Sequence, residues 1–598
     1  MTLDFDFSKN LITGDIILYM HPLKAGVTYL TLDIWDLNIT SVSTSSSGAL
    51  EYTITDPDPA LGKALNITTP ASQLGSPEYV HIKYTTQAFI AGSWLKPEQT
   101  AGKKMDYFFT QCQSIYCRNL APLQDTPAVK SKYHVDIITE PKFVSRVSGN
   151  LTQEGIQNGK KVTSFDMDIP VESYLLAVAI GDLAEKKVGD RTYVITEPSM
   201  LDKAAEELDQ LEDSLIKAEK YLTPYIWGDY KILILPPSFP FGGMENPLLT
   251  FASPTIIVGD KSSVDVATHE IAHSWTGNLV TNMNWENFWL NEGFTVFTER
   301  KVTKMNRGEV FYKVAAKLGN FSMVAAMEGY GWNHSYSSLT PIMNGANPDD
   351  SYSEIPYEKG FQFITYLESL VGEDLFQKFY QGYVTEFKYK SLTVDDMKNS
   401  YIKFVQDNFS SSKATELLAQ IEWDKWIYEP GLPPVTLDFE TEEYNDAVGL
   451  AHDYIKGAGK VSPDDREEYH TWFVTLKGIF LATLLDHKDI ITSDIVNLIG
   501  KDLNIASEIN AEILYLWYQL AIGSGAHSTP YTAETEFLES VGRLKYIQPL
   551  YTTLQQVDSQ FAVDTYFKFC DLYHPIAQDF LEKALKVSKC SSAKQLTH

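Results

Sequence analysis

The stretch HEIAHSWTGNLV, residues 269–280, lies near the middle of the chain and places two histidines and a carboxylate within little more than one helical turn. In an α-helix, side chains four residues apart lie on the same face, so the imidazoles of His269 and His273 can reach a common metal ion. Glu270 lies beside them, where its carboxylate can serve as a general base. A helix whose histidines are satisfied in the core is the alternative, because a HExxH pattern also arises by chance in long chains.

A third ligand follows in the helix-like segment WENFWLNEGFTVFTER, residues 285–300. Catalytic zinc takes three protein ligands and keeps one coordination position open, and His269, His273 and Glu292 supply such a set. Glu299 lies two turns beyond Glu292 on the same helix face, where its carboxylate can accept the second ring N–H of a ligand histidine. An exposed helix carboxylate is an equally good interpretation of Glu299. We therefore expect one zinc ion per chain.

The chemistry of such a site is hydrolysis. Zinc acidifies water and polarises a carbonyl group, while a carboxylate such as that of Glu270 takes a proton from water and passes it to the leaving amine. The sequence thus predicts a zinc peptidase. A catalytically silent peptide-binding or scaffold protein that keeps the fold is the alternative hypothesis, from a different functional class.

The length and composition are those of a globular protein with several domains. The chain has 598 residues, of which 44% are hydrophobic and 21% charged, and at roughly 100 to 200 residues per domain this length predicts three or four domains. The formal net charge of -29, from 49 basic against 78 acidic residues, argues against a nucleic-acid partner, which needs clustered Lys and Arg. We interpret most of this charge as a solubility feature, although acidic cleft walls could also attract a cationic substrate.

Nothing in the sequence predicts secretion or a membrane span. The N-terminal stretch MTLDFDFSKNLITGD lacks a basic n-region and an apolar h-region. The most apolar long run, TWFVTLKGIFLATLL, carries Lys477 and is shorter than a bilayer span. The chain has four cysteines, too few for a disulfide framework at this size, namely Cys112, Cys117, Cys570 and Cys590. We therefore expect a monomeric protein of the reducing cytoplasm.

The patterning divides the chain into three domains. Residues 1–184 contain short runs rich in Val, Ile, Tyr and Thr, such as YHVDIITEP and SYLLAVAIGDL, and predict a β-rich domain. Residues 185–427 are mixed α/β and include MLDKAAEELDQLEDSLIKAEKYL, which predicts one amphipathic helix. Residues 428–441, with PGLPP, predict a proline-rich linker. Residues 442–598 predict consecutive helices, such as EINAEILYLWYQLAIGSG and VDTYFKFCDLYHPIAQDFLEKALKV, so the fold class is multidomain α+β.

A second motif, GGMEN in PPSFPFGGMENPLLTF, precedes the metal motif. Together with HEIAHSW and LNEGFT it resembles the zinc aminopeptidases of the gluzincin type, in which the glutamate of GxMEN binds the free α-amino group of the substrate. The resemblance implies this role for Glu245, and an anionic anchor at a fixed distance from zinc admits only a chain end that carries an ammonium. Gly242 and Gly243, followed by Met244, would let the backbone approach the substrate closely. A glycine turn is the alternative for this motif alone.

Within this family the resemblance is greatest to the leukotriene-A4 hydrolases and their aminopeptidase relatives, and it extends over nearly the whole chain. The stretches that carry it are QCQSIYCRNLAPLQDTPAVK, PPSFPFGGMENP, THEIAHSWTGNLVTNMNWENFWLNEGFTVFTER, IPYEKGF, PGLPP and GRLKY. It implies a β-rich saddle domain, a thermolysin-like α/β catalytic domain and an all-α helical C-terminal domain, which match the divisions above.

The resemblance also implies roles for further residues. Tyr357 in IPYEKGF falls where the family has a tyrosine that stabilises the oxyanion, a role that suits a phenol donor. Gln111 and Gln113 are similar to the glutamine region that lines the substrate cleft. Arg543 and Lys545 in GRLKY resemble the pair that receives a substrate carboxylate. From the residues alone, a core tyrosine and two surface cations would be the favoured interpretations.

A second reaction of the family opens a lipid epoxide, and Asp349 falls at the aspartate that directs a water in that reaction. Tyr352 falls at a tyrosine that lines the same pocket, although a solvated loop is the alternative for both residues. Phe241 and Phe294 stand where the vertebrate hydrolases have tyrosine and histidine, which puts the epoxide reaction in doubt more than the peptidase reaction. We expect the substrates to be short peptides with a free N-terminus, because a helical domain over the cleft should exclude folded proteins.

Overall fold

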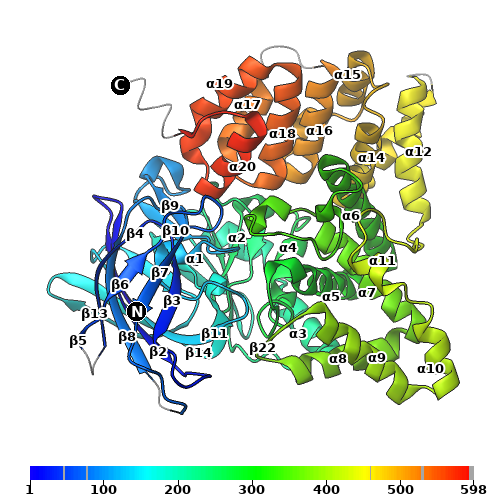
Figure 1. Cartoon of the computed structure of the whole chain (residues 1–598). Coiled ribbons are helices and arrows are strands. Elements are labelled where there is room, and N and C mark those ends of the chain that lie inside the picture. Colours follow the sequence, from blue (N-terminus) through cyan, green and yellow to red (C-terminus); the bar gives the residue numbers. More distant parts are fainter. Residues whose placement is uncertain (45–47, 76–77, 458–459, 527–530, 591–598) are drawn as a thin grey trace.

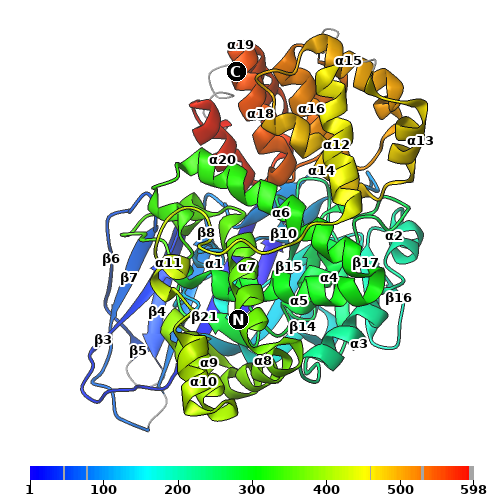
Figure 2. The same ribbon diagram turned by 90° about the vertical axis from the view of Figure 1, so that its right-hand side faces the viewer.

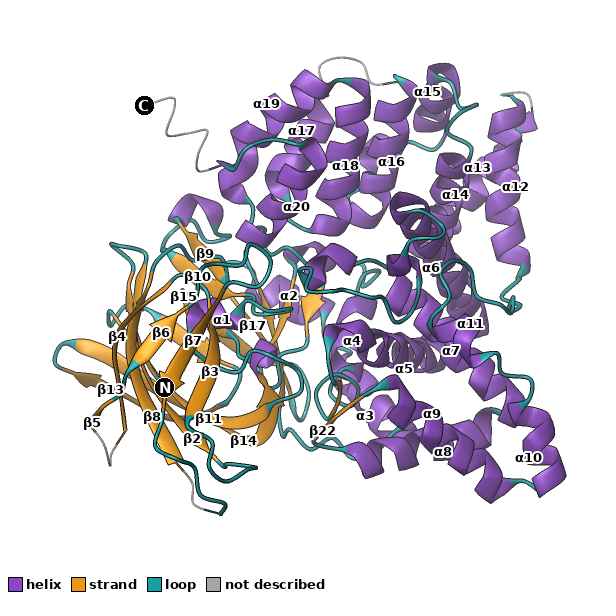
Figure 3. Cartoon of the chain, viewed as in Figure 1, coloured by secondary structure: helices purple, strands orange, loops and turns teal. Residues whose placement is uncertain are grey.

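The computed structural model describes residues 1–44, 48–75, 78–457, 460–526 and 531–590. Strands gather in the N-terminal part of the chain, whereas helices make up most of the rest (Figure 3). The blue and cyan N-terminal strands lie beside the green catalytic part, and the orange and red C-terminal helices cover both (Figure 1). The predicted multidomain α+β class, with a β-rich, a catalytic and a helical part, is confirmed.

The N-terminal part contains an eight-stranded sheet in the order β13-β14-β11-β1-β2-β8-β4-β5, a three-stranded sheet β3-β7-β6 and a four-stranded sheet β12-β15-β10-β9. The elements are β1 (Thr2–Asp6), β2 (Leu11–Met20), β3 (Tyr29–Ile34), β4 (Leu37–Thr44), β5 (Gly48–Ala49), β6 (Tyr52–Ile54), β7 (Lys63–Thr68), β8 (Glu78–Thr86), β9 (Gly92–Leu95), β10 (Tyr107–Thr110), α1 (Cys117–Leu120), β11 (Lys130–Thr139), β12 (Val144–Val147), β13 (Asn150–Gln157), β14 (Lys160–Glu172) and β15 (Val178–Gly181).

The four-stranded sheet joins the N-terminal part to the catalytic part. Successive side chains of a strand point to opposite faces, so Phe108 and Val178 enter the core shared with the eight-stranded sheet. Their neighbours Phe109 and Ala179 enter the core of the catalytic part. Because one sheet is buried on both faces, the two parts are held in a fixed relation.

The catalytic part is built on a five-stranded sheet, β16-β17-β18-β20-β19, flanked by helices and a two-stranded sheet, β21-β22. Its strands are β16 (Ala184–Lys187), β17 (Thr192–Thr196), β18 (Tyr230–Ile234), β19 (Gly243–Met244), β20 (Thr250–Ala252), β21 (Val280–Asn282) and β22 (Lys390–Leu392). Its helices are α2 (Leu201–Glu207), α3 (Leu211–Tyr221), α4 (Asp265–Ala272), α5 (Trp289–Arg307), α6 (Glu309–Tyr330), α7 (Ile355–Val371), α8 (Glu373–Phe387), α9 (Val394–Asn408), α10 (Ser411–Leu418) and α11 (Trp423–Ile427).

The prediction of one amphipathic helix over MLDKAAEELDQLEDSLIKAEKYL is wrong, since α2 ends before α3 begins. Glu207, the last residue of α2, is 2% exposed. Its carboxylate accepts the backbone N–H groups of Gly259 and Lys261 at 2.8 and 2.9 Å. A buried carboxylate needs such partners, and these contacts with a distant loop coincide with the break.

The C-terminal part consists of stacked helices. They are α12 (Glu442–Lys456), α13 (Pro463–Thr471), α14 (Val474–Asp486), α15 (Ser493–Asp502), α16 (Ala511–Ser524), α17 (Thr532–Ser540), α18 (Leu544–Val557), α19 (Ser559–Phe569) and α20 (Pro575–Leu585). In this series α12 packs on α14, α14 on α16 and α16 on α18, and α14 also packs on α6 of the catalytic part. Figure 2 shows the yellow α12 in front of this stack, above the green helices.

Residues 428–441 contain neither helix nor strand and connect α11 to α12. This segment is packed rather than loose. The Lys359 ammonium donates to the Glu429 carbonyl at 2.9 Å, and Phe439 is buried against Tyr312 and Phe361. The connection between the two helical parts is therefore anchored to the catalytic core at Phe439.

Cys570 and Cys590 form a disulfide, which the sequence did not predict. The fold brings the end of α19 against the segment that follows α20, whereas Cys112 and Cys117 are free and buried. None of the described helices combines the length and the apolar character that a membrane span requires.

Candidate active site

Three predicted metal ligands converge between α4 and α5. The Nε2 atoms of His269 and His273 lie 3.1 Å apart, and the Glu292 Oε2 atom lies 3.5 Å from the first and 3.2 Å from the second. His273 follows the last residue of α4 in helical conformation, which keeps it on the same face as His269. The structure therefore brings together the three residues that the HExxH spacing and the downstream glutamate indicated.

The outer ring nitrogens of both histidines are held by acceptors. His269 Nδ1 lies 3.0 Å from Glu299 Oε2, and His273 Nδ1 lies 2.9 Å from the Thr276 carbonyl. Since a carbonyl oxygen only accepts, Nδ1 of His273 carries a proton, and Nε2 is the ring nitrogen that can bind a metal ion when its own proton is released. Two imidazole nitrogens and a carboxylate oxygen thus face one another, and these are ligand types that suit a zinc ion.

The site contains several carboxylates that act on the two histidines. Burial lowers the pKa of His273, but Glu245 and Glu292 outweigh it and raise the pKa to about 9. Burial also lowers the pKa of His269, whereas Glu292 and Glu299 raise it well above its usual value. Burial raises the pKa of Glu292, but the two histidines have a larger effect and bring this pKa down to about 2. The carboxylates therefore favour positive charge at this point.

Glu270 lies against the GGMEN segment. A Cβ atom on Gly243 would sit 2.2 Å from Glu270 Oε1, so the glycine makes room for this carboxylate. Burial raises the pKa of Glu270 to about 8, opposed by the two histidines and reinforced by Glu245. One ligand atom each of Glu245, Glu270 and His273 lies within 4.8 Å of the others, so the two motifs meet at one place.

The segment after the histidines holds Glu245 in position. The Asn278 backbone N–H donates to the His273 carbonyl at 3.1 Å, while its side-chain amide donates to the Glu245 carbonyl at 2.9 Å. Gly277 has φ +118°, and a Cβ atom there would lie 2.7 Å from His273 Nδ1. Glycine is required at this turn for both reasons. The Asn278 carbonyl in turn accepts from Lys130 of the N-terminal part at 3.0 Å.

Tyr357 lies on α7 and lines the cavity beside His269. Its ring stacks on His269 with centroids 6.0 Å apart and meets Tyr352 edge-on at 6.3 Å. Tyr352 in turn contacts Phe241 at 5.4 Å. Burial, helped by Glu292, raises the pKa of Tyr357 well above its usual value, so its hydroxyl stays protonated and can donate.

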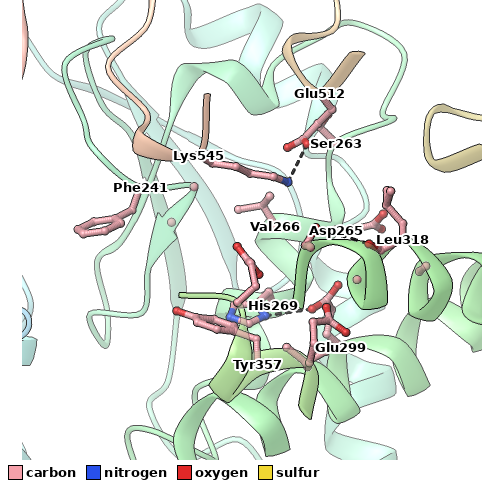
Figure 4. A pocket seen from close by; sticks show the side chains of 18 of the residues that line it. Phe241, Ser263, Asp265, Val266, His269, Glu299, Leu318, Tyr357, Glu512 and Lys545 are labelled. Atoms are coloured by element: carbon pink, nitrogen blue, oxygen red, sulfur yellow. Dashed lines mark hydrogen bonds and ion pairs between the residues drawn. The ribbon is translucent and has the colours of Figure 1, made fainter. Parts of the chain in front are cut away.

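These residues line a cavity of about 310 Å³ between the catalytic and C-terminal parts. Figure 4 shows His269, Glu299 and Tyr357 at one end, with Glu512 and Lys545 at the other. The predicted residues that line it are Gln113, Gly242, Gly243, Glu245, His269, Glu270, His273, Glu292, Glu299, Tyr352, Tyr357, Arg543 and Lys545.

Three predicted residues lie behind the described cavity wall, namely Gln111, Met244 and Asp349. The Gln111 amide donates to the Met244 sulfur at 3.3 Å. Asp349 is buried and accepts the hydroxyl of Tyr116 at 2.7 Å, so it does not lie in a solvated loop. Burial raises the pKa of its carboxyl.

Phe241 and Phe294, the two residues that differ from the vertebrate hydrolases, lie in different places. Phe241 lines the cavity. Phe294 is fully buried between Tyr380 and Tyr383, with ring centroids at 5.0 and 5.2 Å. Phe294 therefore belongs to the core beneath the site and is not among the residues that line the cavity.

The helical part contributes residues that the sequence did not single out. Glu512, Tyr515 and Leu516 of α16 line the cavity, as do Val474 and Gly478 of α14. Glu512 binds both predicted cations, Lys545 at 2.7 Å and Arg543 at 3.3 Å. No motif marks these residues, which lie on ordinary helices far along the chain.

Comparison with known families matches three segments of the chain. Residues 1–175 match the Peptidase M1 N-terminal domain, residues 203–426 the Peptidase family M1 domain, and residues 472–585 the Leukotriene A4 hydrolase C-terminal domain. The order of the three matches follows the N-terminal, catalytic and helical parts described above.

Individual relatives match over nearly the full length. Leucine aminopeptidase 2 of Aspergillus terreus is 36% identical over 98% of this chain and 95% of its own. The leukotriene A-4 hydrolase homolog of Botryotinia fuckeliana is 37% identical over 98% of this chain and 91% of its own. The solved structure of yeast LTA4 hydrolase in complex with bestatin is similar, with a TM-score of 0.90 at 30% identity over 98% of this chain and 95% of that chain. The resemblance inferred from the motifs is confirmed.

Proposed function

The chain belongs to the M1 peptidase family, in the group with a leukotriene A4 hydrolase-type C-terminal domain, and from this premise we propose that it is a zinc aminopeptidase that removes N-terminal residues from short peptides. The observation that carries the proposal is the meeting of Glu245, Glu270 and His273 beside the three-donor set.

His269, His273 and Glu292 would hold the zinc ion, with one ion per chain. When bound there, zinc supplies acidification of water and polarisation of the substrate carbonyl. Glu299 keeps the proton of His269 on Nδ1, which leaves Nε2 free as a donor atom. The donor set and its acidic surroundings support this assignment.

Glu270 acts as the general base. Its Oε2 atom has no hydrogen-bond partner among the described residues, so it is available to a water molecule. Glu270 takes a proton from the attacking water and delivers it to the nitrogen of the leaving amine. Burial raises the pKa of Glu270, which strengthens its carboxylate as a base, and a positive charge held by the neighbouring ligands would favour its ionised form.

Glu245 binds the α-ammonium of the substrate. It is 4% exposed, and its Oε1 atom has no hydrogen-bond partner among the described residues. A buried, unpartnered carboxylate oxygen is costly, and an ammonium with three N–H donors satisfies it. An acylated nitrogen carries no such charge, so cleavage is confined to the first peptide bond.

Strand β19, which leads into Glu245, supports the orientation of the substrate. It lies at the edge of its sheet, beside β20 alone. An extended peptide can pair with such an edge through its backbone. This arrangement would carry the scissile bond past Glu270, which lies against Gly243.

Tyr357 and the Arg543–Lys545 pair complete the proposal. The Tyr357 hydroxyl donates to the oxyanion that forms at the attacked carbonyl. Arg543 and Lys545 receive the C-terminal carboxylate. Arg543 packs against Gly242, where a Cβ atom would lie 2.6 Å from its Nη2.

The Glu270→Gln variant tests the mechanism. Because Glu270 is not among the ligands, zinc measured in the purified variant should match the wild type, while kcat falls by about 10² to 10⁴-fold. Glu286→Gln is a matched control, since Glu286 caps the Met343 N–H outside the cavity. Turnover by Glu270→Gln near the wild-type rate would overturn the assignment of the base.

Hydrolysis of a fatty-acid epoxide in the same cavity is a second proposal. The matching C-terminal domain and the aromatic pair Phe241–Tyr352 in the cavity wall support it. Asp349 is the aspartate expected to direct a water molecule in this reaction. Its carboxylate accepts a hydrogen bond from Tyr116 and would have to exchange this partner for water. Incubation with leukotriene A4 followed by product analysis decides it, and the absence of a dihydroxy acid would reject it.

A further inference from the structure

Arg543, Lys545 and Glu512 form a charged cluster in the cavity wall. Figure 4 shows Lys545 and Glu512 at the end of the cavity that lies away from His269. Glu512 Oε2 accepts from the Lys545 ammonium at 2.7 Å, and Oε1 accepts from Arg543 Nη1 at 3.3 Å. The Tyr546 hydroxyl also donates to Oε1, at 2.8 Å. Arg543 and Lys545 are expected to bind the substrate carboxylate. Both already pair with the carboxylate of Glu512.

The two cations still have donors to offer. Arg543 has five N–H groups and Lys545 three, and the hydrogen bonds that Arg543 makes to described residues, to Glu512 and Tyr546, all leave from Nη1. Its Nη2 atom lies against Gly242, where a Cβ atom would be 2.6 Å away, and both residues line the cavity. A substrate carboxylate can thus bind without displacing Glu512, but it must do so beside a negative charge.

The cluster carries little net charge. Burial raises the pKa of Glu512, but Lys545 and Arg543 lower it more, to about 2, so Glu512 is ionised at neutral pH. Two cations and one anion leave a single positive charge. Glu354 lines the same cavity, and its charge acts on Arg543. The remaining positive charge is therefore partly offset by Glu354.

We propose that Glu512 is a specificity-determining residue that weakens the binding of a peptide C-terminal carboxylate to Arg543 and Lys545, so that the enzyme also accepts peptides without a carboxylate at that distance. This inference rests on the aminopeptidase function proposed above. Like charges a few ångströms apart repel each other even in high dielectric. Removal of the Glu512 charge should therefore strengthen carboxylate binding by about three- to tenfold.

The test compares one tripeptide as its free acid and as its C-terminal amide. The quantity is the ratio of kcat/KM for the acid to kcat/KM for the amide. In Glu512→Gln, which keeps an acceptor oxygen for Tyr546, this ratio should rise by about three- to tenfold, mainly through a lower KM for the acid. Glu512→Ala should shift the ratio in the same direction. Thermal melting of each variant verifies that it is folded.

Glu508→Gln is the matched control. Glu508 precedes α16, pairs with Lys477 at 2.8 Å and is not among the cavity residues. The variant changes the total charge as Glu512→Gln does, and it should leave the ratio unaltered. In the wild type, the ratio should depend only weakly on ionic strength, because screening acts little on a cluster of low net charge.

The outcomes separate the two proposals. An unchanged or lower ratio in folded Glu512→Gln, or a steep loss of the wild-type acid preference with salt, overturns the role of Glu512. If the wild type hydrolyses both peptides while the variants leave the ratio constant, only this inference fails. If the wild type hydrolyses neither peptide, the aminopeptidase proposal and this inference fail together.

Discussion

Gly243 and Glu270 are in such close contact that a Cβ atom on the glycine would lie 2.2 Å from the Glu270 carboxylate oxygen. The Gly243→Ala variant should therefore push the proposed base away from its position. A displacement of about 1 Å costs on the order of 10²-fold in rate, so we expect kcat to fall by about that factor while zinc stays bound. Steady-state kinetics with an aminoacyl anilide measures this.

Gly155→Ala is the control for that experiment. Gly155 lies in strand β13 with no atom near enough to meet a new Cβ, so the change has the same chemistry without the collision. Its kinetics should equal those of the wild type. A Gly243→Ala enzyme as fast as the control would show that the Glu270 carboxylate tolerates displacement, against the proposed role.

Tyr357→Phe removes one hydroxyl beside His269. If that hydroxyl donates to the oxyanion, kcat should fall by about 10² to 10³-fold with little change in KM, because the bond is made only in the transition state. Tyr383→Phe is the control, since Tyr383 is buried and stacks on Phe294 in the core. A Tyr357→Phe enzyme whose loss lies in KM alone would contradict the role.

Glu245→Gln removes the charge that is proposed to hold the substrate ammonium. We expect kcat/KM to fall by about 10²-fold, largely through KM, because a buried charge pair is worth several kcal/mol to the complex. The variant should also lose its preference for free over acetylated N-termini. Equal discrimination in the variant and the wild type would mean that another group binds the amine.

His574 makes the stability depend on pH. It is fully buried at the start of α20, where its Nδ1 accepts the Ile576 N–H, and it packs on Phe109. Burial lowers its pKa from 6.5 to about 3. As the pH falls below 6.5, His574 is protonated in the unfolded chain but stays neutral in the folded chain. The free energy of unfolding therefore decreases. At pH 5 the loss is about 2 kcal/mol.

The His574→Asn variant tests this, because asparagine can still accept the Ile576 N–H at the helix start but does not titrate. Melting measured between pH 7 and pH 5 should show a smaller decline than in the wild type. His21→Asn, at an exposed histidine, should decline as the wild type does. Parallel declines in all three proteins would reject His574 as the cause.

Much of the fold and the central site follows from local sequence patterns. The HExxH spacing puts His269 and His273 on one helical face whatever surrounds them. Glu292 and Glu299 share a face of α5 for the same reason. Strand alternation and proline placement likewise depend on neighbours in the chain, so the β-rich, catalytic and helical parts were predictable.

Other features depend on contacts between distant segments. The sequence around Glu207 does not indicate that its carboxylate binds the backbone of residues 259–261, nor that its helix ends at Glu207. Glu512 is an ordinary helix residue until the fold sets it against Lys545. The polar sequence around Asp349 is compatible with a solvated loop, yet the hydroxyl of Tyr116 from the N-terminal part donates to its carboxylate. Such pairings are set by packing, which the local pattern does not encode.

The central claim, a zinc enzyme that requires a free N-terminus, is tested most directly by one comparison of substrates. An aminoacyl anilide and its N-acetyl derivative are incubated with the full-length protein, before and after removal of metal with a chelator and after return of zinc. We predict hydrolysis of the free compound alone, at least about tenfold lower after chelation and restored by zinc. Hydrolysis that survives chelation, or that proceeds equally on the acetylated compound, would contradict the account.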